Sequence, residues 1–308
     1  LSITKYPALP IWGIEDKDIY FKNILDFNRI MKFNPSSQVF ISQTKKAIEL
    51  LKPKIYSKDL LELDNKESEF SSQKLDTAKY IEYLLDSSNM INSHGRSKNI
   101  DNILFERSAT GGESRTAKYK NIFLLKETME MEKHIDQLKI MKDSQNILLN
   151  LQSIFSSKAL NNDSDTLMAR ANLFKDQKLS PFSFYSYLKD LALKHIKEDF
   201  STKYSELNSF IDYLTKVNSL DSTKLFTELE DLNFEIKQNL SKTSEQKTLI
   251  KASRNINFLE NFFNLKVSNE DLDYYLNNKS DHKVTFIKSF LQEILKKYNI
   301  NSFIDYSP

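Results

Sequence analysis

Cysteine is absent from this chain of 308 residues, and glycine and proline are scarce, with 4 and 6 residues. The missing thiols exclude disulfides and thiolate metal ligands, which favours an interior compartment over a secreted one. Glycine is preferred in tight hairpin turns, and average usage of about 7% would supply roughly 20 glycines. The shortage argues against β-sheets and predicts an all-α fold in which polar turns join the helices.

An excess of charge of one sign is also missing, because 44 Lys and Arg residues balance 42 Asp and Glu residues to a net charge of +2. A chain without a strong basic excess is not expected to be covered by nucleic acid on all sides, although a local contact stays compatible with this balance. No apolar run approaches the roughly 18 residues of a transmembrane helix, so we expect no membrane insertion.

Apolar residues at helical spacing run through most of the chain. The stretch 118–158 has no Gly or Pro and predicts one long central helix, with a break around 142–144 where Ser and Asp compete for backbone hydrogen bonds. The fold prediction is an irregular multi-helix bundle. Because 179–191 aligns with 220–232 at an offset typical of helical pairs, a short α-solenoid of such pairs stays the alternative.

The first helix is predicted to begin at a cap on Asp16 or Asp18, and Pro35 is predicted to stop it. Its apolar residues recur on one face, so we expect a buried stripe made of Tyr20, Ile24, Phe27 and Met31.

Polar and proline-containing stretches mark the predicted boundaries between segments of the chain. These are an extended arm at 1–15, an N-terminal helical subdomain at 16–106 with a polar linker at 64–74, a basic glycine-containing loop and long helix at 107–160, and a C-terminal helical bundle at 161–308. The sequence begins at Leu1, either because a targeting segment was removed or because it starts late.

Motifs of common enzyme classes are missing. The glycines of 110–115 are not followed by Lys-Ser/Thr, so this is not a phosphate-binding P-loop. No His-Glu-x-x-His occurs; Glu130 and His134 are predicted to form a surface pair, and His195 a solvated pair with Glu198. We therefore predict no catalytic residues, no metal, no cofactor and no small-molecule substrate.

Basic residues gather in two glycine-containing loops close in sequence, which suits phosphate contacts, and a neighbouring tyrosine could stack on a base. The RNA-contact candidates are Arg96, Lys98, Arg107, Arg115, Lys118, Tyr119 and Lys120. The alternative is a solvated loop that binds nothing. In the arm, Leu9, Ile11 and Trp12 are apolar enough to need a groove, either on this chain's own helical body or on a partner.

The Lys-, Asn- and Ser-rich helical character, the absent cysteine and the missing start residue resemble mature fungal mitochondrial proteins. Size and near-neutral charge resemble the mitochondrion-specific proteins of the small mitochondrial ribosomal subunit. This resemblance rests on overall character, so it assigns no site residues. It implies a mitochondrial location and a non-enzymatic structural role, with rRNA and neighbouring ribosomal proteins as partners. The alternative is a helical protein–protein adaptor or effector without a nucleic-acid role.

Overall fold

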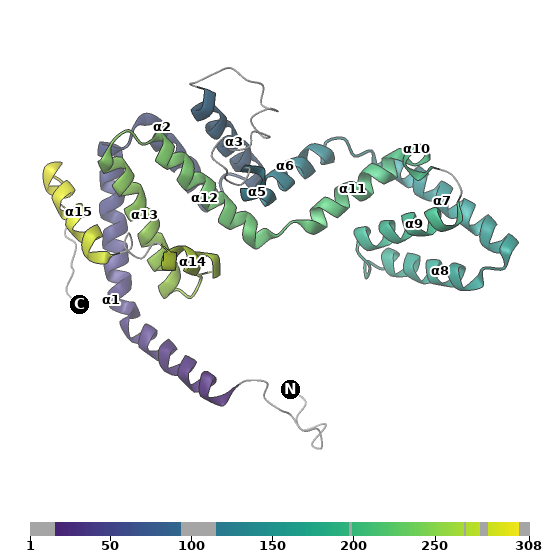
Figure 1. Cartoon of the computed structure of the whole chain (residues 1–308), viewed down its shortest axis with the longest axis horizontal. Coiled ribbons are helices and arrows are strands. Elements are labelled where there is room, and N and C mark those ends of the chain that lie inside the picture. The colour runs from purple at the N-terminus through teal and green to yellow at the C-terminus, as the bar shows by residue number, and fades with distance from the viewer. Residues whose placement is uncertain (1–15, 94–114, 197–198, 268, 278–282, 302–308) are drawn as a thin grey trace. The chain divides into compact units, whose positions relative to one another are not determined.

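A computed structural model describes residues 16–93, 115–196, 199–267, 269–277 and 283–301. These residues form helices and no strands, so the predicted all-α fold with bundle-like helix packing is confirmed (Figure 1). The predicted arm at 1–15, with Leu9, Ile11 and Trp12, lies outside the described residues.

The chain divides into two compact units. The first unit joins residues 1–65 to 237–308, and the second contains 66–236, so the first is discontinuous in sequence. The divisions fall inside two helices, α2 and α12. The helices, in chain order, are α1 (Lys17–Ile55), α2 (Lys58–Ser71), α3 (Thr77–Ser93), α5 (Arg115–Lys118), α6 (Lys120–Glu132), α7 (Gln137–Lys158), α8 (Asn161–Lys175), α9 (Pro181–His195), α10 (Phe200–Lys203), α11 (Ser205–Ser219), α12 (Ser222–Leu240), α13 (Ser244–Phe263), α14 (Asn269–Asn277) and α15 (Val284–Lys297).

The first unit is built on the contact between α1 and α13, and α15 also packs on α1. The interior side chains are aliphatic and nearly inaccessible: Ile41, Ile48 and Leu51 of α1, Leu249 and Ile256 of α13, and Ile287 and Leu291 of α15. The side chain of Gln246 donates to the backbone carbonyl of Ile55 at 2.9 Å. Gln246 also completes a capping box with Thr243, which fixes the start of α13.

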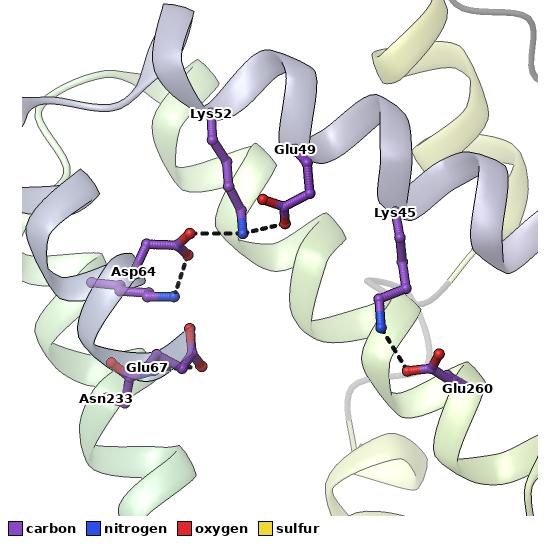
Figure 2. A network of polar contacts seen from close by, with 8 residues as sticks. Lys45, Glu49, Lys52, Asp64, Glu67, Asn233 and Glu260 are labelled. Carbon is purple, nitrogen blue, oxygen red and sulfur yellow. Dashed lines mark hydrogen bonds and ion pairs between the residues drawn. The ribbon is translucent and has the colours of Figure 1, made fainter. Parts of the chain in front are cut away.

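A buried ionic cluster ties three helices of the first unit together (Figure 2). The carboxylate of Asp64 accepts from Lys52 Nζ at 2.8 Å and from Lys237 Nζ at 2.9 Å. The three side chains are only 8–12% exposed. Lys52 also reaches Glu49 on the surface, at 2.6 Å. Burial raises the pKa of the Asp64 carboxyl, but the charges of Lys237 and Lys52, with the hydrogen bonds that these two side chains donate, outweigh burial and hold it below the ordinary 3.8.

The second unit contains a cluster of packed helices, α7 to α11, around an aliphatic and aromatic core. Ile147, Leu151, Leu188 and Leu207 are fully buried in it. At its edge the rings of Phe174 and Phe184 stack at 4.4 Å, Tyr185 lies edge-on to both, and Phe210 meets Tyr185 in turn. Aromatic pairs of this kind stabilise a core beyond their buried area.

His195 is not the solvated residue that the sequence suggested. Its Nε2 atom lies 2.8 Å from Asp163 Oδ2, and its side chain is 9% exposed. Lys194 Nζ contacts the same carboxylate at 2.9 Å. Asp163 lies in the first turn of α8, and both basic residues lie in the last turn of α9. Opposite charges therefore match the dipoles of these two helix ends.

The long helix predicted over 118–158 is interrupted, and at a different place from the predicted 142–144. Helix α6 ends at Glu132, and the side chain of Asp136 accepts from the backbone amides of Leu138 and Lys139 to begin α7. Ser144 stays inside α7, because its hydroxyl donates to the carbonyl of Ile140, one turn back.

The longest described helix is α1, which continues through Pro35 instead of stopping there. A proline inside a helix removes one backbone hydrogen bond and crowds the preceding turn, at a cost of about 3 kcal/mol. The buried contact with α13, which follows this position, offsets that cost. The predicted polar linker at 64–74 is also largely helical, since α2 extends to Ser71 and Asp64 lies in its buried part.

Candidate docking surface on helix α1

The N-terminal half of α1 exposes apolar side chains, and three of them, Tyr20, Ile24 and Phe27, belong to the stripe that the sequence predicts to be buried. Leu25 is 61% exposed, Phe21 is 52% and Phe27 is 45% exposed. Ile19, Tyr20 and Ile24 are exposed as well. Scattered apolar residues are common on surfaces, but a concentration on consecutive turns of one helix marks an interaction site.

The exposed residues continue the line by which α1 packs on α13. Every seventh residue of α1 falls on this line, namely Tyr20, Phe27, Asn34, Ile41, Ile48 and Ile55. The last three are at most 8% exposed and face the first unit's interior. The Asn34 side chain donates to the carbonyl of Phe263, the last residue of α13, at 3.4 Å. N-terminal to Asn34, the line extends beyond the last residue of its partner helix.

Figure 1 shows the N-terminal part of α1 extending past the end of α13. A heptad line of this kind is how one helix packs along another, with each apolar side chain inserted between residues of the partner. Ile24 lies within one turn of both Tyr20 and Phe27, and the exposed side chains of Phe21 and Leu25 extend the apolar surface from this line around the side of the helix. We define the docking stripe as Tyr20, Phe21, Ile24, Leu25 and Phe27.

The charges around the docking stripe are mixed. Asp16 caps the helix by accepting from the amides of Asp18 and Ile19, and Arg29 pairs with Asp26 at 3.4 Å. Lys22 and Lys32 are two further basic residues in this half, and Asp18 is a further acidic one. Helices that lie on anionic membranes or on phosphates carry a strong basic excess on the polar face. The near-neutral balance instead favours an apolar protein surface as the partner.

The predicted RNA-contact residues are divided by the structure. Arg96, Lys98 and Arg107 lie outside the described residues. Arg115 begins the short helix α5, and Lys120 begins α6 with an exposed side chain.

Tyr119 is 2% exposed, and its hydroxyl donates to Glu235 Oε2 at 2.7 Å. The same carboxylate accepts from Lys118 Nζ at 2.9 Å, and this amine lies 4.8 Å from the centre of the Tyr119 ring. The ring therefore has no face available for stacking on a base in this structure, contrary to its predicted role. Lys118 keeps a half-exposed side chain, but its charge is already matched by Glu235.

Helix α6 begins at a carboxylate supplied by α12. Glu228 accepts from the backbone amides of Asn121 and Ile122 at 2.8 and 3.0 Å, and from the Asn121 side chain at 2.7 Å. The first amides of a helix have no partner within it, and an anion at this end also meets the positive end of the helix dipole. Glu228 thus takes the place of a local cap, since Tyr119 makes no side-chain cap bond.

Replacing Glu228 with Ala is expected to lower the free energy of unfolding of the second unit by about 2 kcal/mol, because charge-assisted hydrogen bonds to a helix start are lost together. Urea unfolding followed by circular dichroism measures the change. Glu132→Ala, at the other end of α6, is the matched control and should stay within about 0.5 kcal/mol of the parent. Equal stability of the Glu228→Ala and Glu132→Ala variants would contradict this assignment.

Within the described residues, no group of three or more His, Asp or Glu side chains is arranged to hold a metal ion. In the same part of the chain, no helix has the length and apolar content needed to cross a membrane. No protein-family model, curated protein or solved structure matches the chain.

Proposed function

We propose that this chain is a non-enzymatic helical adaptor that joins a larger protein assembly through the docking stripe of α1. The single observation that carries the proposal is the heptad line that is buried against α13 and then continues exposed beyond Phe263. An apolar helix face that is about half exposed gains free energy when a partner covers it, at roughly 1.5–3 kcal/mol for each fully buried large side chain.

The occupant to which we commit is an amphipathic helix of another protein. It would pack against the part of α1 that lies beyond the end of α13, roughly in line with α13. It would present Leu, Ile or Phe side chains toward Tyr20, Ile24 and Phe27. The segment 17–33 would span about 25 Å as a helix, which is enough for two heptads of contact. The mixed charges beside the stripe call for a partner helix with both signs at its flanks.

A second candidate is a structural component of a ribonucleoprotein, in particular a peripheral protein of the small mitochondrial ribosomal subunit. Its support is the basic character of 94–120, where Lys120 begins α6 with an exposed side chain, and the compositional resemblance to such proteins. In this function rRNA would contact the loops while the docking stripe contacts a neighbouring ribosomal protein. A mitochondrial location belongs to this candidate alone.

Sedimentation of the native protein from the cells that make it separates the two candidates. An adaptor should sediment with a larger assembly before and after ribonuclease treatment. A ribosomal component should move to smaller sizes after ribonuclease, and Arg107→Ala/Arg115→Ala/Lys120→Ala should weaken its association. Lys118 is left unchanged because it pairs with Glu235. Sedimentation as a single chain under all conditions would contradict both candidates.

A further inference from the structure

Helix α13 ends with a leucine in a backbone conformation that favours glycine. The backbone amide of Leu265 donates to the carbonyl of Phe262, and the amide of Lys266 donates to the carbonyl of Asn261. These two bonds close the last turn of the helix and need a left-handed residue between them. That residue is Leu265, with a φ of 56°. A Cβ atom makes this conformation costly, so glycine or asparagine is the usual choice here.

Packing within the chain offsets little of the cost at Leu265, because its side chain is 57% exposed. The other described non-glycine residues with a positive φ are polar or small: Gln73, Ala159, Gln177 and Asn299. Leu265 therefore combines an unfavourable backbone conformation with an exposed apolar side chain. This combination points to a contact that the isolated chain does not supply.

Leu265 directly follows the residues that fix the end of α13 on α1. The carbonyl of Phe263 accepts from the Asn34 side chain at 3.4 Å, and the side-chain oxygen of Asn264 accepts from Gln38 at 3.2 Å. Asn34 is the position on the heptad line at which burial against α13 gives way to the docking stripe. The exposed leucine thus lies close to the point where the line loses its partner helix.

Helices α1 and α13 run in opposite directions, since the start of α13 meets the end of α1 through the bond from Gln246 to the Ile55 carbonyl. A partner helix that continues α13 in the same direction begins near Leu265 and runs antiparallel to α1. Its positive N-terminal end then meets the negative C-terminal end of α13, and its dipole opposes that of α1 beside it. The reverse direction would bring two negative helix ends together.

The charges at the end of α13 favour the same direction. Lys266 is exposed immediately after Leu265. Glu260, the acidic residue in the last turn of α13, contacts Lys45 of α1 at 2.7 Å. Acidic side chains are favoured in the first turn of a helix because they complement its dipole. A first turn of this kind is also complementary to the amine of Lys266.

We propose that the partner helix runs antiparallel to α1, with an apolar side chain of its first turn on Leu265 and an acidic one beside Lys266. The inference rests on the proposed docking of a helix on the stripe, and it adds the direction and the first-turn chemistry of that helix. Helix α13 and the partner helix then follow one another along α1, and Leu265 covers the junction between them.

Because the chain has no cysteine, a photo-crosslinker can be attached at one chosen position of the full-length protein. Lys266→Cys and Asn23→Cys, at two exposed positions, are each labelled with benzophenone-4-maleimide and irradiated in the native assembly. Mass spectrometry then locates the attachment points. We expect both labels on one partner helix, with the label at 266 nearer its N-terminus by roughly ten residues, because positions 23 and 34 lie roughly 16 Å apart along α1.

The attachment points separate this inference from the proposed function. The reverse order, attachment from position 23 alone, or attachment of the two labels to different helices would overturn the direction proposed here and leave docking on α1 intact. Absence of attachment from position 23 to any partner would contradict the docking itself. Leu149→Cys, at an exposed position of α7, is the labelling control and should not attach to the same helix.

Leu265→Gly provides a second test, in which folding and binding should change in opposite directions. Glycine relieves the backbone cost, so the urea midpoint of the isolated chain should be at least that of the parent. Association with the assembly should weaken by about tenfold, because an apolar contact is lost. Asn299→Gly, at the corresponding position after α15, is the matched control and should associate like the parent. A lower midpoint or an unchanged association of Leu265→Gly would overturn the role given to Leu265.

Discussion

Replacing Asp64 with Asn is expected to lower the free energy of unfolding of the first unit by about 3–5 kcal/mol. The substitution keeps the size of the side chain but removes the negative charge that Lys52 and Lys237 both contact, and these two side chains are 11% and 8% exposed. Without the Asp64 carboxylate, the charges of the two lysines stay buried but lose the negative charge that balanced them. The protein interior solvates such unbalanced charges poorly, so the folded state is destabilised. For Lys52, the contact with Glu49 at the surface offsets part of the loss.

Urea unfolding monitored by circular dichroism measures this effect, and Glu49→Gln is the control. The Glu49 side chain is 65% exposed, so its ion pair with Lys52 is expected to contribute no more than about 1 kcal/mol. If Asp64→Asn and Glu49→Gln lowered the free energy of unfolding by the same amount, the buried ionic cluster would not stabilise the first unit in the way that we describe.

The difference between the parent and Asp64→Asn should also depend on pH. The pKa of the Asp64 carboxyl is held below 3.8 in the folded chain, so its stabilising contribution is complete above that value. It is lost as the pH falls through the lower, folded-state pKa, because the carboxyl then binds a proton in both states. We expect a constant difference between about pH 5 and 7 that shrinks below about pH 4.

The second large effect concerns binding rather than stability. Ile24→Glu/Phe27→Glu is expected to weaken association with the partner assembly by more than about 100-fold, since two apolar contacts are lost and two charges would have to be buried. Both side chains are exposed in the isolated chain, at 37% and 45%, so its own unfolding should change little.

Leu138→Glu/Leu149→Glu is the matched control for that experiment. These leucines of α7 are 75% and 65% exposed, and the variant introduces the same two charges far along the sequence from α1. It should associate with the assembly like the parent. If both variants lost association equally, added negative charge and not the docking stripe would be responsible.

Local signals in the sequence predict much of the helical fold. Ser180-Pro181 predicts the start of α9, and in the structure the Ser180 hydroxyl accepts from the amide of Ser183. Such caps involve neighbours within three residues, so they can be recognised in sequence. The continuation of α1 through Pro35 could not be predicted in this way, because it depends on contacts with α13, more than 200 residues later.

The candidate site has the same limitation. The apolar spacing of Tyr20, Ile24 and Phe27 is evident in the sequence and predicts a buried face. Whether that face is covered depends on where α13 ends, at Phe263, and no pattern near α1 carries this information. Likewise, Tyr119 next to two lysines suggests a base-stacking residue in the sequence. In the structure its hydroxyl donates to Glu235 of α12, and Glu228 of the same helix accepts from the amide of Asn121, so the tyrosine is buried.

Hydrogen–deuterium exchange of the backbone amides of 17–33 tests the central claim most directly, when the chain alone is compared with the chain in its native assembly. We predict that exchange in this segment slows by about tenfold or more in the assembly, because a partner helix covers the docking stripe and stabilises the turns beneath it. Exchange in this segment at the same rate in both states would contradict the proposed docking.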